Sequence, residues 1–344
     1  MQNFAQRVLP FVTIGLFFTS CDSRQDHIAA AEGKGRLAQS KYDQGDYARA
    51  AVLAGEAVNE LTSLVGSDDP RTLDCRHLLA EFLRAAGRIE EAISENRRVV
   101  ETSTRVLGET DEDTLCARIR LAAALAEVYN SNGDPDTAAA QEGENICQTT
   151  LDFAVKDLGP ESTPAMKARQ TLAVIQAKSG KFKEAIQNNT VLVEIQRMKL
   201  GNEDESTITT RMNLAGALLA QKLYDPALRE FQTVYDIRKK RVGEDHPDTI
   251  IAESWIGMCL SDQNRLAEAL PVLRDVWERR KRVLGKAHRR TLVAGFNLAV
   301  SEMNSGNREE AKRIVTALYE FALEAYGPAD SQTQMYQQAI EKVK

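Results

Sequence analysis

The sequence predicts an all-α solenoid of about seven helix pairs, followed by one helix that caps the C-terminal end. Three observations predict it: a motif that recurs at a constant interval, small residues at fixed positions around a turn in each copy, and a composition typical of packed helices. Of the 344 residues, 43% are hydrophobic and 6% are aromatic, as expected for a helical protein rich in Ala and Leu.

The recurring motif is a glycine that precedes a threonine by six residues. Its best copy is Gly-Glu-Asp-His-Pro-Asp-Thr, from Gly243 to Thr249. Successive glycines lie 42 residues apart, except for one gap of 93 residues that holds a further copy at Gly159 and a nine-residue insertion. The regularly spaced glycines are Gly66, Gly108, Gly201, Gly243, Gly285 and Gly327. A constant period of this length indicates stacked repeats, each of them one supersecondary unit.

Two small residues flank a turn in each copy. An Ala or Gly lies seven residues before the turn residue, and an Ala lies five residues after it. Small side chains at these positions let two antiparallel helices approach closely where they cross. In the third copy the pattern places the turn at Gly133, the first small residue at Ala126 and the second at Ala138. The turn residues of the other copies are Gly45, Gly87, Gly180, Lys222, Asn264 and Gly306.

This pattern resembles the tetratricopeptide repeat, and the 42-residue period with the link at 243–249 is similar to the kinesin-light-chain-like subclass of that family. The resemblance covers about residues 27–333 in seven copies. It implies a right-handed α-solenoid in which the first helix of each pair lines a concave groove. The fold leaves the ligand open, because one fold serves many unrelated functions.

The repeats divide the chain into a solenoid over 27–327 and a capping helix over 328–344. The insertion predicts an extended third repeat, about 113–158, with a longer helix pair. In the fifth repeat we expect helices at 207–221 and 223–242. The capping helix is expected to cover the last repeat with Met335, Ala339, Ile340 and Val343.

Residues 1–20 have the pattern of a signal peptide: Arg7 precedes an apolar run over 8–18 that is too short to span a bilayer. The run ends in Phe-Thr-Ser-Cys, which resembles the lipobox of bacterial lipoproteins, with Phe18 where Leu is usual. The resemblance implies a lipid on Cys21, a short tether over 21–26, and an exported lipoprotein facing the periplasm or cell surface without a transmembrane helix. Export without a lipid and an uncleaved start remain alternatives.

The sequence offers little for catalysis. A net charge of −6 without a basic run argues against nucleic-acid binding. The cysteines lack metal-ligand spacing, and His246 and His288 recur at one position of the linker turns, which favours a structural role. We therefore expect no catalytic residue, no metal and no cofactor. A Cys75–Cys116 disulfide is conceivable in an exported protein, although buried free thiols are favoured.

A binding surface is expected at positions two, five, nine and twelve after the repeat threonine, which the resemblance turns toward the groove. In the second repeat these positions are polar, with Asp74, His77, Glu81 and Arg84. In the last three repeats they are mostly apolar, which suits an apolar peptide or helix. The alternative is that these residues belong to the core between helices. The candidates among them are Met212, Met258, Phe296 and Met303.

Two further features point to a peptide ligand. Asn213 and Asn297 resemble the second Asn of the family's Asn-Asn-Leu-Ala motif, which implies that their amides clamp a peptide backbone. The first Asn is replaced here by Met212 and Phe296. Arginines also recur four residues after the threonine and predict a ladder for an acidic peptide, or ion pairs with carboxylates of the neighbouring repeat. They are Arg76, Arg118, Arg169 and Arg211.

The sequence therefore predicts a non-catalytic scaffold that binds a peptide or helix of a partner protein in its groove. One alternative is a structural accessory of an envelope assembly or secretion complex that docks through its outer surface. Another is a hydrolase with an unrecognised site.

Overall fold

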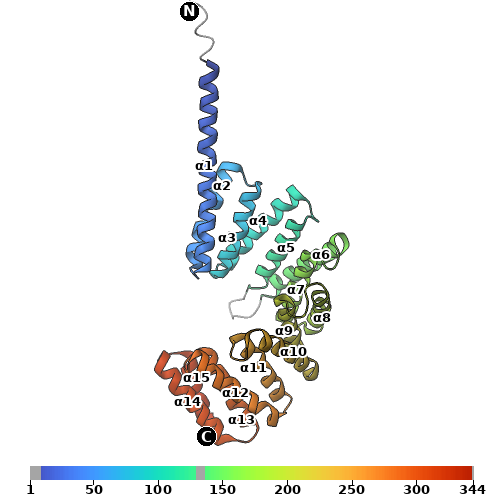
Figure 1. Ribbon diagram of the computed structural model, residues 1–344, viewed down its shortest axis with the longest axis vertical. Coiled ribbons are helices and arrows are strands. Elements are labelled where there is room, and N and C mark those ends of the chain that lie inside the picture. Colours follow the sequence, from blue (N-terminus) through green and yellow to red (C-terminus); the bar gives the residue numbers. More distant parts are fainter. Residues whose placement is uncertain (1–8, 129–135, 343–344) are drawn as a thin grey trace, which may run out of the picture. The chain divides into compact units, whose positions relative to one another are not determined.

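The computed structural model describes residues 9–128 and 136–342, with side chains described from residue 24 onward. Over these residues every regular element is a helix and no strand is present (Figure 1). The chain forms two compact units, Met1–Gly180 and Lys181–Lys344. The all-α prediction is confirmed.

The first unit stacks seven helices, each packed against the next along the chain, and α5 also contacts α7. They are α1 (Leu9–Asp43), α2 (Tyr47–Val65), α3 (Pro70–Ala85), α4 (Ile89–Leu107), α5 (Glu112–Leu125), α6 (Thr137–Leu158) and α7 (Thr163–Lys178). We call the odd-numbered helices the first helices of their pairs.

In the second unit α8 (Phe182–Lys199) begins the same kind of stack, and from α9 onward first and second helices alternate. The helices are α9 (Glu205–Ala220), α10 (Tyr224–Val242), α11 (Pro247–Asp262), α12 (Leu266–Leu284), α13 (Arg289–Asn304), α14 (Arg308–Tyr326) and α15 (Ser331–Lys342). The helices of the fifth repeat, α9 and α10, begin and end within two residues of the predicted bounds.

The glycine-to-threonine spacing has a direct physical reason. The hydroxyl of Thr249 donates to the carbonyl oxygen of Gly243 at 2.8 Å, and Thr72 and Thr207 make the same bond to Gly66 and Gly201. Gly243 has a φ of 89°, a conformation that glycine adopts without strain at the end of a helix. The bond therefore closes the link between a second helix and the next first helix.

Side chains at the N-caps of the first helices complete these links. The Asp204 carboxylate accepts from the backbone N–H of Ser206, and the imidazoles of His246 and His288 accept from Asp248 and Arg290 at 3.2 and 3.1 Å. These bonds satisfy N–H groups that have no partner within the helix. The two recurring histidines are therefore helix caps, which agrees with the structural role predicted for them.

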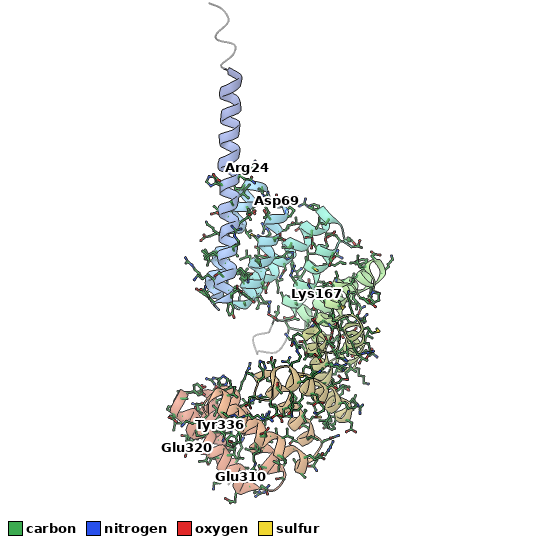
Figure 2. All side chains as sticks on the ribbon, viewed as in Figure 1. Arg24, Asp69, Lys167, Glu310, Glu320 and Tyr336 are labelled. Carbon is green, nitrogen blue, oxygen red and sulfur yellow. The ribbon has the colours of Figure 1, made fainter. Side chains whose placement is uncertain are left out.

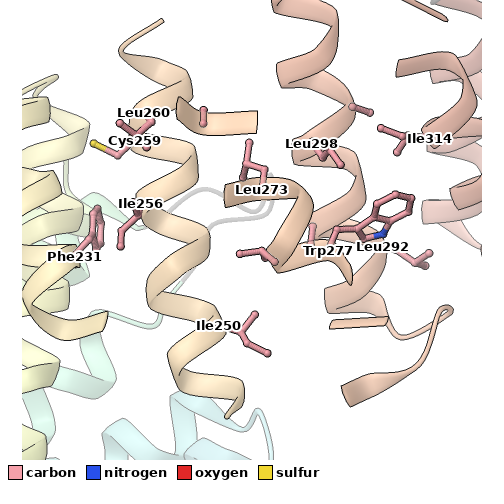
Figure 3. Close-up of a cluster of buried hydrophobic side chains, with 14 of the residues drawn as sticks. Phe231, Ile250, Ile256, Cys259, Leu260, Leu273, Trp277, Leu292, Leu298 and Ile314 are labelled. Carbon is pink, nitrogen blue, oxygen red and sulfur yellow. The ribbon is translucent and has the colours of Figure 1, made fainter. Parts of the chain in front are cut away.

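The small residues lie where the helices cross. A Cβ added to Gly257 would stand 2.7 Å from Leu273 Cδ2, and one added to Gly295 would stand 2.7 Å from Leu318 Cδ2. The apolar side chains around these crossings form one core cluster that runs through the second unit, with Phe231, Leu273 and Trp277 among its members (Figure 3). Each helix pair thus buries its apolar stripe against its neighbours.

The third repeat differs from its prediction. The small residue that meets α6 is Ala122, whose carbonyl oxygen lies 3.0 Å from a Cβ added to Gly143, and the buried alanine of α6 is Ala140, while Ala138 is exposed. The predicted turn at Gly133 lies outside the described residues. Only α6, with 22 residues, is longer than its counterparts, whereas α5 has 14. The inserted residues before α6 therefore extend the connection and leave α5 unlengthened.

The two ends of the chain also differ in detail. In α15 the side chains of Thr333 and Tyr336 are buried, whereas Met335, expected to cover the last repeat, is 39% exposed. Ala339 and Ile340 pack partly against the core as expected, and Val343 lies outside the described residues. At the other end, residues 21–26, expected to be a tether, lie within α1.

The anchor predictions at the N-terminus stay predictions. The side chain of Cys21 lies outside the described set, and the assignment of 1–20 as a signal peptide is not tested by the fold. Among the helices of the described ranges, none combines the length and apolar character needed to cross a bilayer.

Candidate functional site

The last three first helices of the second unit, α11, α13 and α15, carry apolar side chains at one repeated position. Ile251 on α11, Val293 on α13 and Met335 on α15 each lie two residues after their repeat threonine. Val293 is 43% exposed, and Val300, two helical turns further along α13, is 44% exposed. We call Ile251, Val293, Val300 and Met335 the apolar face. In Figure 2 the label at Tyr336 marks the C-terminal part of the chain, which carries the apolar face.

Side-chain contacts join the neighbouring first helices that carry this face. The Asn297 amide of α13 donates to Met258 Sδ of α11 at 3.3 Å, and the hydroxyls of Ser261 and Ser301 lie 2.8 Å apart. On the other side of α13, the Phe296 ring centroid lies 5.8 Å from that of Tyr336 on α15. These contacts join each of the three successive first helices to the next.

The candidates Met212, Met258 and Phe296 are half-buried and pack against the core cluster. Their inner sides therefore lie in the core between helices, as the alternative interpretation expected. Met303 and Asn213 are also half-buried, and the Asn297 amide is engaged with Met258. Their role in peptide binding stays a prediction.

Two arginines of the ladder form ion pairs within their own helix pairs. Arg76 donates to Glu95 at 2.8 Å, and Arg211 donates to Glu230 at 2.6 Å and to Asn202 at 3.1 Å. These contacts match the ion-pair alternative, with the difference that the carboxylate comes from the same repeat. Arg118 instead lies over the Phe153 ring, 5.8 Å from its centroid.

Arg169 is the remaining candidate of the ladder, and burial lowers the pKa of its guanidinium. Arg169 and Arg211 were predicted to contact a peptide, and that prediction remains untested.

The first unit carries a second surface of different character. A hollow of about 450 Å³ lies between α3, α4 and α5. The Arg120 guanidinium approaches His77 Nδ1 at 3.1 Å. Burial, together with the charge of Arg120, lowers the pKa of His77 to about 4, so the imidazole is neutral at pH 7. The polar residues that line the hollow are Asp68, Asp74, His77, Glu81, Ser103, Asp113, Cys116 and Arg120.

Sequence reasoning placed Asp74, His77, Glu81 and Arg84 on one face, and the structure brings the first three to this hollow. It missed the contributions of α5, namely Asp113 and Arg120, and it missed Asn96 of α4, which together with Arg84 lines an adjoining hollow. The polar residues of α5 recur at no fixed repeat position. The signal for Asn96 was present, because its position is apolar in most other repeats.

Cys75, Cys116, Cys147 and Cys259 are free, and the conceivable Cys75–Cys116 bridge is not formed. Burial raises the pKa of the Cys147 thiol to about 12 and that of Cys259 to about 11, so neither is a thiolate at neutral pH. Within 9–128 and 136–342 there is no cluster of three or more residues able to hold a metal ion.

Comparisons with known proteins agree with this architecture. The tetratricopeptide-repeat family models match residues 72–113, 119–141 and 206–282. No curated protein matches the chain at a significant level.

Three solved structures share the fold. A protein of nearly identical tetratricopeptide-like repeats from Podosopora anserina, described as a kinesin light chain, is 20% identical with a TM-score of 0.55, over 62% of this chain and 96% of that one. BtubC from P. vanneervenii is 15% identical with a TM-score of 0.54, over 76% and 92%. A tetratricopeptide repeat protein from Parabacteroides merdae is 12% identical with a TM-score of 0.55, over 92% and 99%.

Proposed function

Because the chain is a tetratricopeptide-repeat protein, we propose that it is a protein-interaction scaffold that binds a peptide or short helix of a partner across the apolar face. One observation carries the proposal: three successive first helices carry an apolar side chain at the same repeat position, exposed at Val293 and Met335 and half-buried at Ile251. Binding makes and breaks no bond.

The chemistry of the face suits such a ligand. Val293 and Val300 lie two turns apart on one helix, so an amphipathic partner can set its own apolar residues between them. Met335 and the half-buried Met258 add unbranched side chains that adjust to different shapes. Each square ångström of apolar surface that a ligand removes from water here contributes about 25 cal/mol to binding.

A pull-down from solubilised membranes tests the proposal. The bait is the chain from residue 22 onward, compared with a Val293→Glu/Val300→Glu double variant of the same helicity. Both side chains are exposed, so the substitutions change the surface without opening a cavity. We expect a partner that the parent retains and the variant loses.

A matched control is available on the second helices of the same unit. Val191 on α8 and Val283 on α12 are 44% and 39% exposed. The Val191→Glu/Val283→Glu variant introduces the same charge away from the apolar face and should keep the partner. Loss of the partner from the control alone would transfer the interaction to the second helices and support docking through the outer surface.

We further propose that Cys21 carries a lipid that holds this scaffold at a bacterial membrane. The support is the sequence pattern around Cys21 and the absence, over the described helices, of a segment suited to span a bilayer.

A further inference from the structure

The hollow between α3, α4 and α5 has unbalanced charges. Asp74, Glu81 and Asp113 line it, and over residues 9–128 and 136–342 none of the three is within ion-pair distance of a cation. By contrast, Asp68 at its rim pairs with Arg105 at 2.7 Å. The cation that reaches into the hollow is Arg120, and it lies against the neutral His77. The hollow therefore carries excess negative charge.

Two of these carboxylates repel each other. Asp74 comes from α3 and Asp113 from the first turn of α5, and both face the same hollow. Burial and then the charge of Asp113 raise the pKa of Asp74 above its usual value. Like charges that share a partly desolvated site destabilise each other, and a cation placed between them relieves both.

Asn96 on α4 is a second and independent sign of a ligand. It is 5% exposed, its amide has no hydrogen-bond partner within the described part of the chain, and it lines an adjoining hollow of about 330 Å³ that shares His77, Glu81 and Arg120 and also includes Arg84. It is the eighth residue of its helix, where α8 also carries a buried asparagine, Asn189, and α10, α12 and α14 carry apolar residues. These are Phe231, Leu273 and Val315. The Asn96 amide therefore leaves a donor and an acceptor available to a ligand in this adjoining hollow.

We propose that this hollow binds a lysine or arginine side chain presented by a partner protein. The cationic group lies between Asp74 and Asp113, and Glu81 adds a third carboxylate on the same wall. The Asn96 amide pairs with the partner's main chain, since an amide offers both a donor and an acceptor. This site lies wholly within the first unit, and it is separate in place and opposite in chemistry from the apolar face.

An array of random 12-residue peptides tests the proposal on the full chain. Each peptide is printed in four forms that differ only at the central residue: lysine, acetyl-lysine, glutamate or leucine. Acetylation removes the charge and keeps most of the side chain. We expect a subset of peptides to bind at least tenfold more tightly with lysine than with acetyl-lysine, measured for the strongest peptides by fluorescence polarisation.

Two variants locate the site. In Asp74→Asn/Asp113→Asn the lysine preference should fall to less than threefold. The control is Glu90→Gln/Glu101→Gln, which removes the same charge from exposed positions of α4 and should keep the preference. Asn96→Leu places a residue found at the same position of α12, so it should raise the melting temperature while weakening the lysine peptides.

Each outcome either supports or overturns part of the proposal. A lysine preference that survives Asp74→Asn/Asp113→Asn would place the cation elsewhere and overturn the site, and unchanged binding by Asn96→Leu would exclude Asn96 from it. If lysine and acetyl-lysine peptides bind equally, the proposal is wrong. In that case leucine peptides that bind the parent and lose affinity in Val293→Glu/Val300→Glu would still support the apolar face, so the two proposals fail separately.

Discussion

Arg238 on α10 donates to the Asp248 carboxylate on α11 at 2.6 Å. Arg280 stands at the same position of α12, the fifteenth residue of its helix, but Arg290 occupies the place equivalent to Asp248. Arg280 is 8% exposed and donates to the Arg290 carbonyl oxygen and the Ser254 hydroxyl. No carboxylate lies within ion-pair distance of it among the described residues. Arg238 is thus neutralised by a carboxylate, whereas the equivalent Arg280 of the next repeat has only neutral partners.

The Arg290→Asp variant should therefore be more stable than the parent. The new carboxylate would reproduce the Arg238–Asp248 pair and remove a like charge whose field, after burial, lowers the pKa of Arg280. A gain of about 1 kcal/mol is expected, or roughly 2–4 °C in Tm for a chain of this size.

Thermal unfolding in an Arg280→Gln background provides the control. Gln196 holds the equivalent position of α8, so the fold accepts that residue. An aspartate near the start of a helix also gains from the helix dipole, and this gain is common to both backgrounds. Only the part of the gain that comes from the ion pair should be lost when Arg280 is replaced. An equal gain in the two backgrounds would show that no pair forms.

The close crossing at Gly295 predicts a loss of stability on adding one methyl group. A Cβ there would lie 2.7 Å from both Trp277 Nε1 and Leu318 Cδ2, so Gly295→Ala should cost about 1–3 kcal/mol through overpacking. Gly216, in the middle of α9, has nothing within 4 Å of an added Cβ, and Gly216→Ala should instead gain about 0.5–1 kcal/mol from helix propensity.

Urea unfolding of the two glycine variants side by side checks both signs. The substitution is identical and both sites are helical. The difference in unfolding free energy between the two variants therefore measures the effect of the close helix crossing at Gly295. A stabilised Gly295→Ala would mean that α12 and α14 move apart at little cost.

The repeat could be read from the sequence because its marks meet physical requirements that several copies share. Gly243 is needed at a φ of 89°, Thr249 closes the link by a hydrogen bond, and small residues are needed where helices cross. Lys222 and Asn264, with φ of 57° and 60°, hold the turn position in two repeats, and their spacing alone identified them. Non-glycine residues adopt this conformation at a modest cost.

The third repeat and the surfaces were harder to predict. An insertion has no counterpart in the other copies, so spacing could not decide whether it lengthened α5 or the connection before α6. Met335 was assigned to the core because α15 has no following repeat to compare with, yet it is exposed like Val293. The hollow in the first unit depends on contacts between α3 and α5, which the period of one repeat does not encode.

Cys21 is expected to anchor the protein through a lipid. Labelling cells that produce the full chain with an alkyne fatty acid should mark the parent and leave Cys21→Ser unmarked, with the protein released to the soluble fraction. Cys75→Ser is the matched control, because that thiol is buried in the first unit. Equal labelling of all three would remove Cys21 as the attachment site, and soluble but unlabelled parent would favour export without a lipid.

Glu253 predicts how stability depends on pH. Its carboxyl is buried on α11, and burial raises its pKa to about 7 although Arg279, at 3.1 Å, acts in the opposite direction. One carboxylate oxygen has no hydrogen-bond partner within the described residues. The folded state therefore binds the proton more tightly than the unfolded state, whose carboxyl titrates near 4.5. Glu253 favours folding below about pH 4.5, and this contribution is lost as pH rises through 7.

The Glu253→Gln variant should remove this dependence, because glutamine resembles the protonated acid and carries no charge at any pH. Parent and variant should unfold at similar urea concentrations at pH 5, and the variant should be the more stable at pH 8.5. If the parent is instead more stable at pH 8.5, the ion pair with Arg279 outweighs the burial of the carboxylate. Arg279 also bonds Asp275 on its own helix, so it keeps a carboxylate partner in the variant and adds no unpaired charge to the comparison.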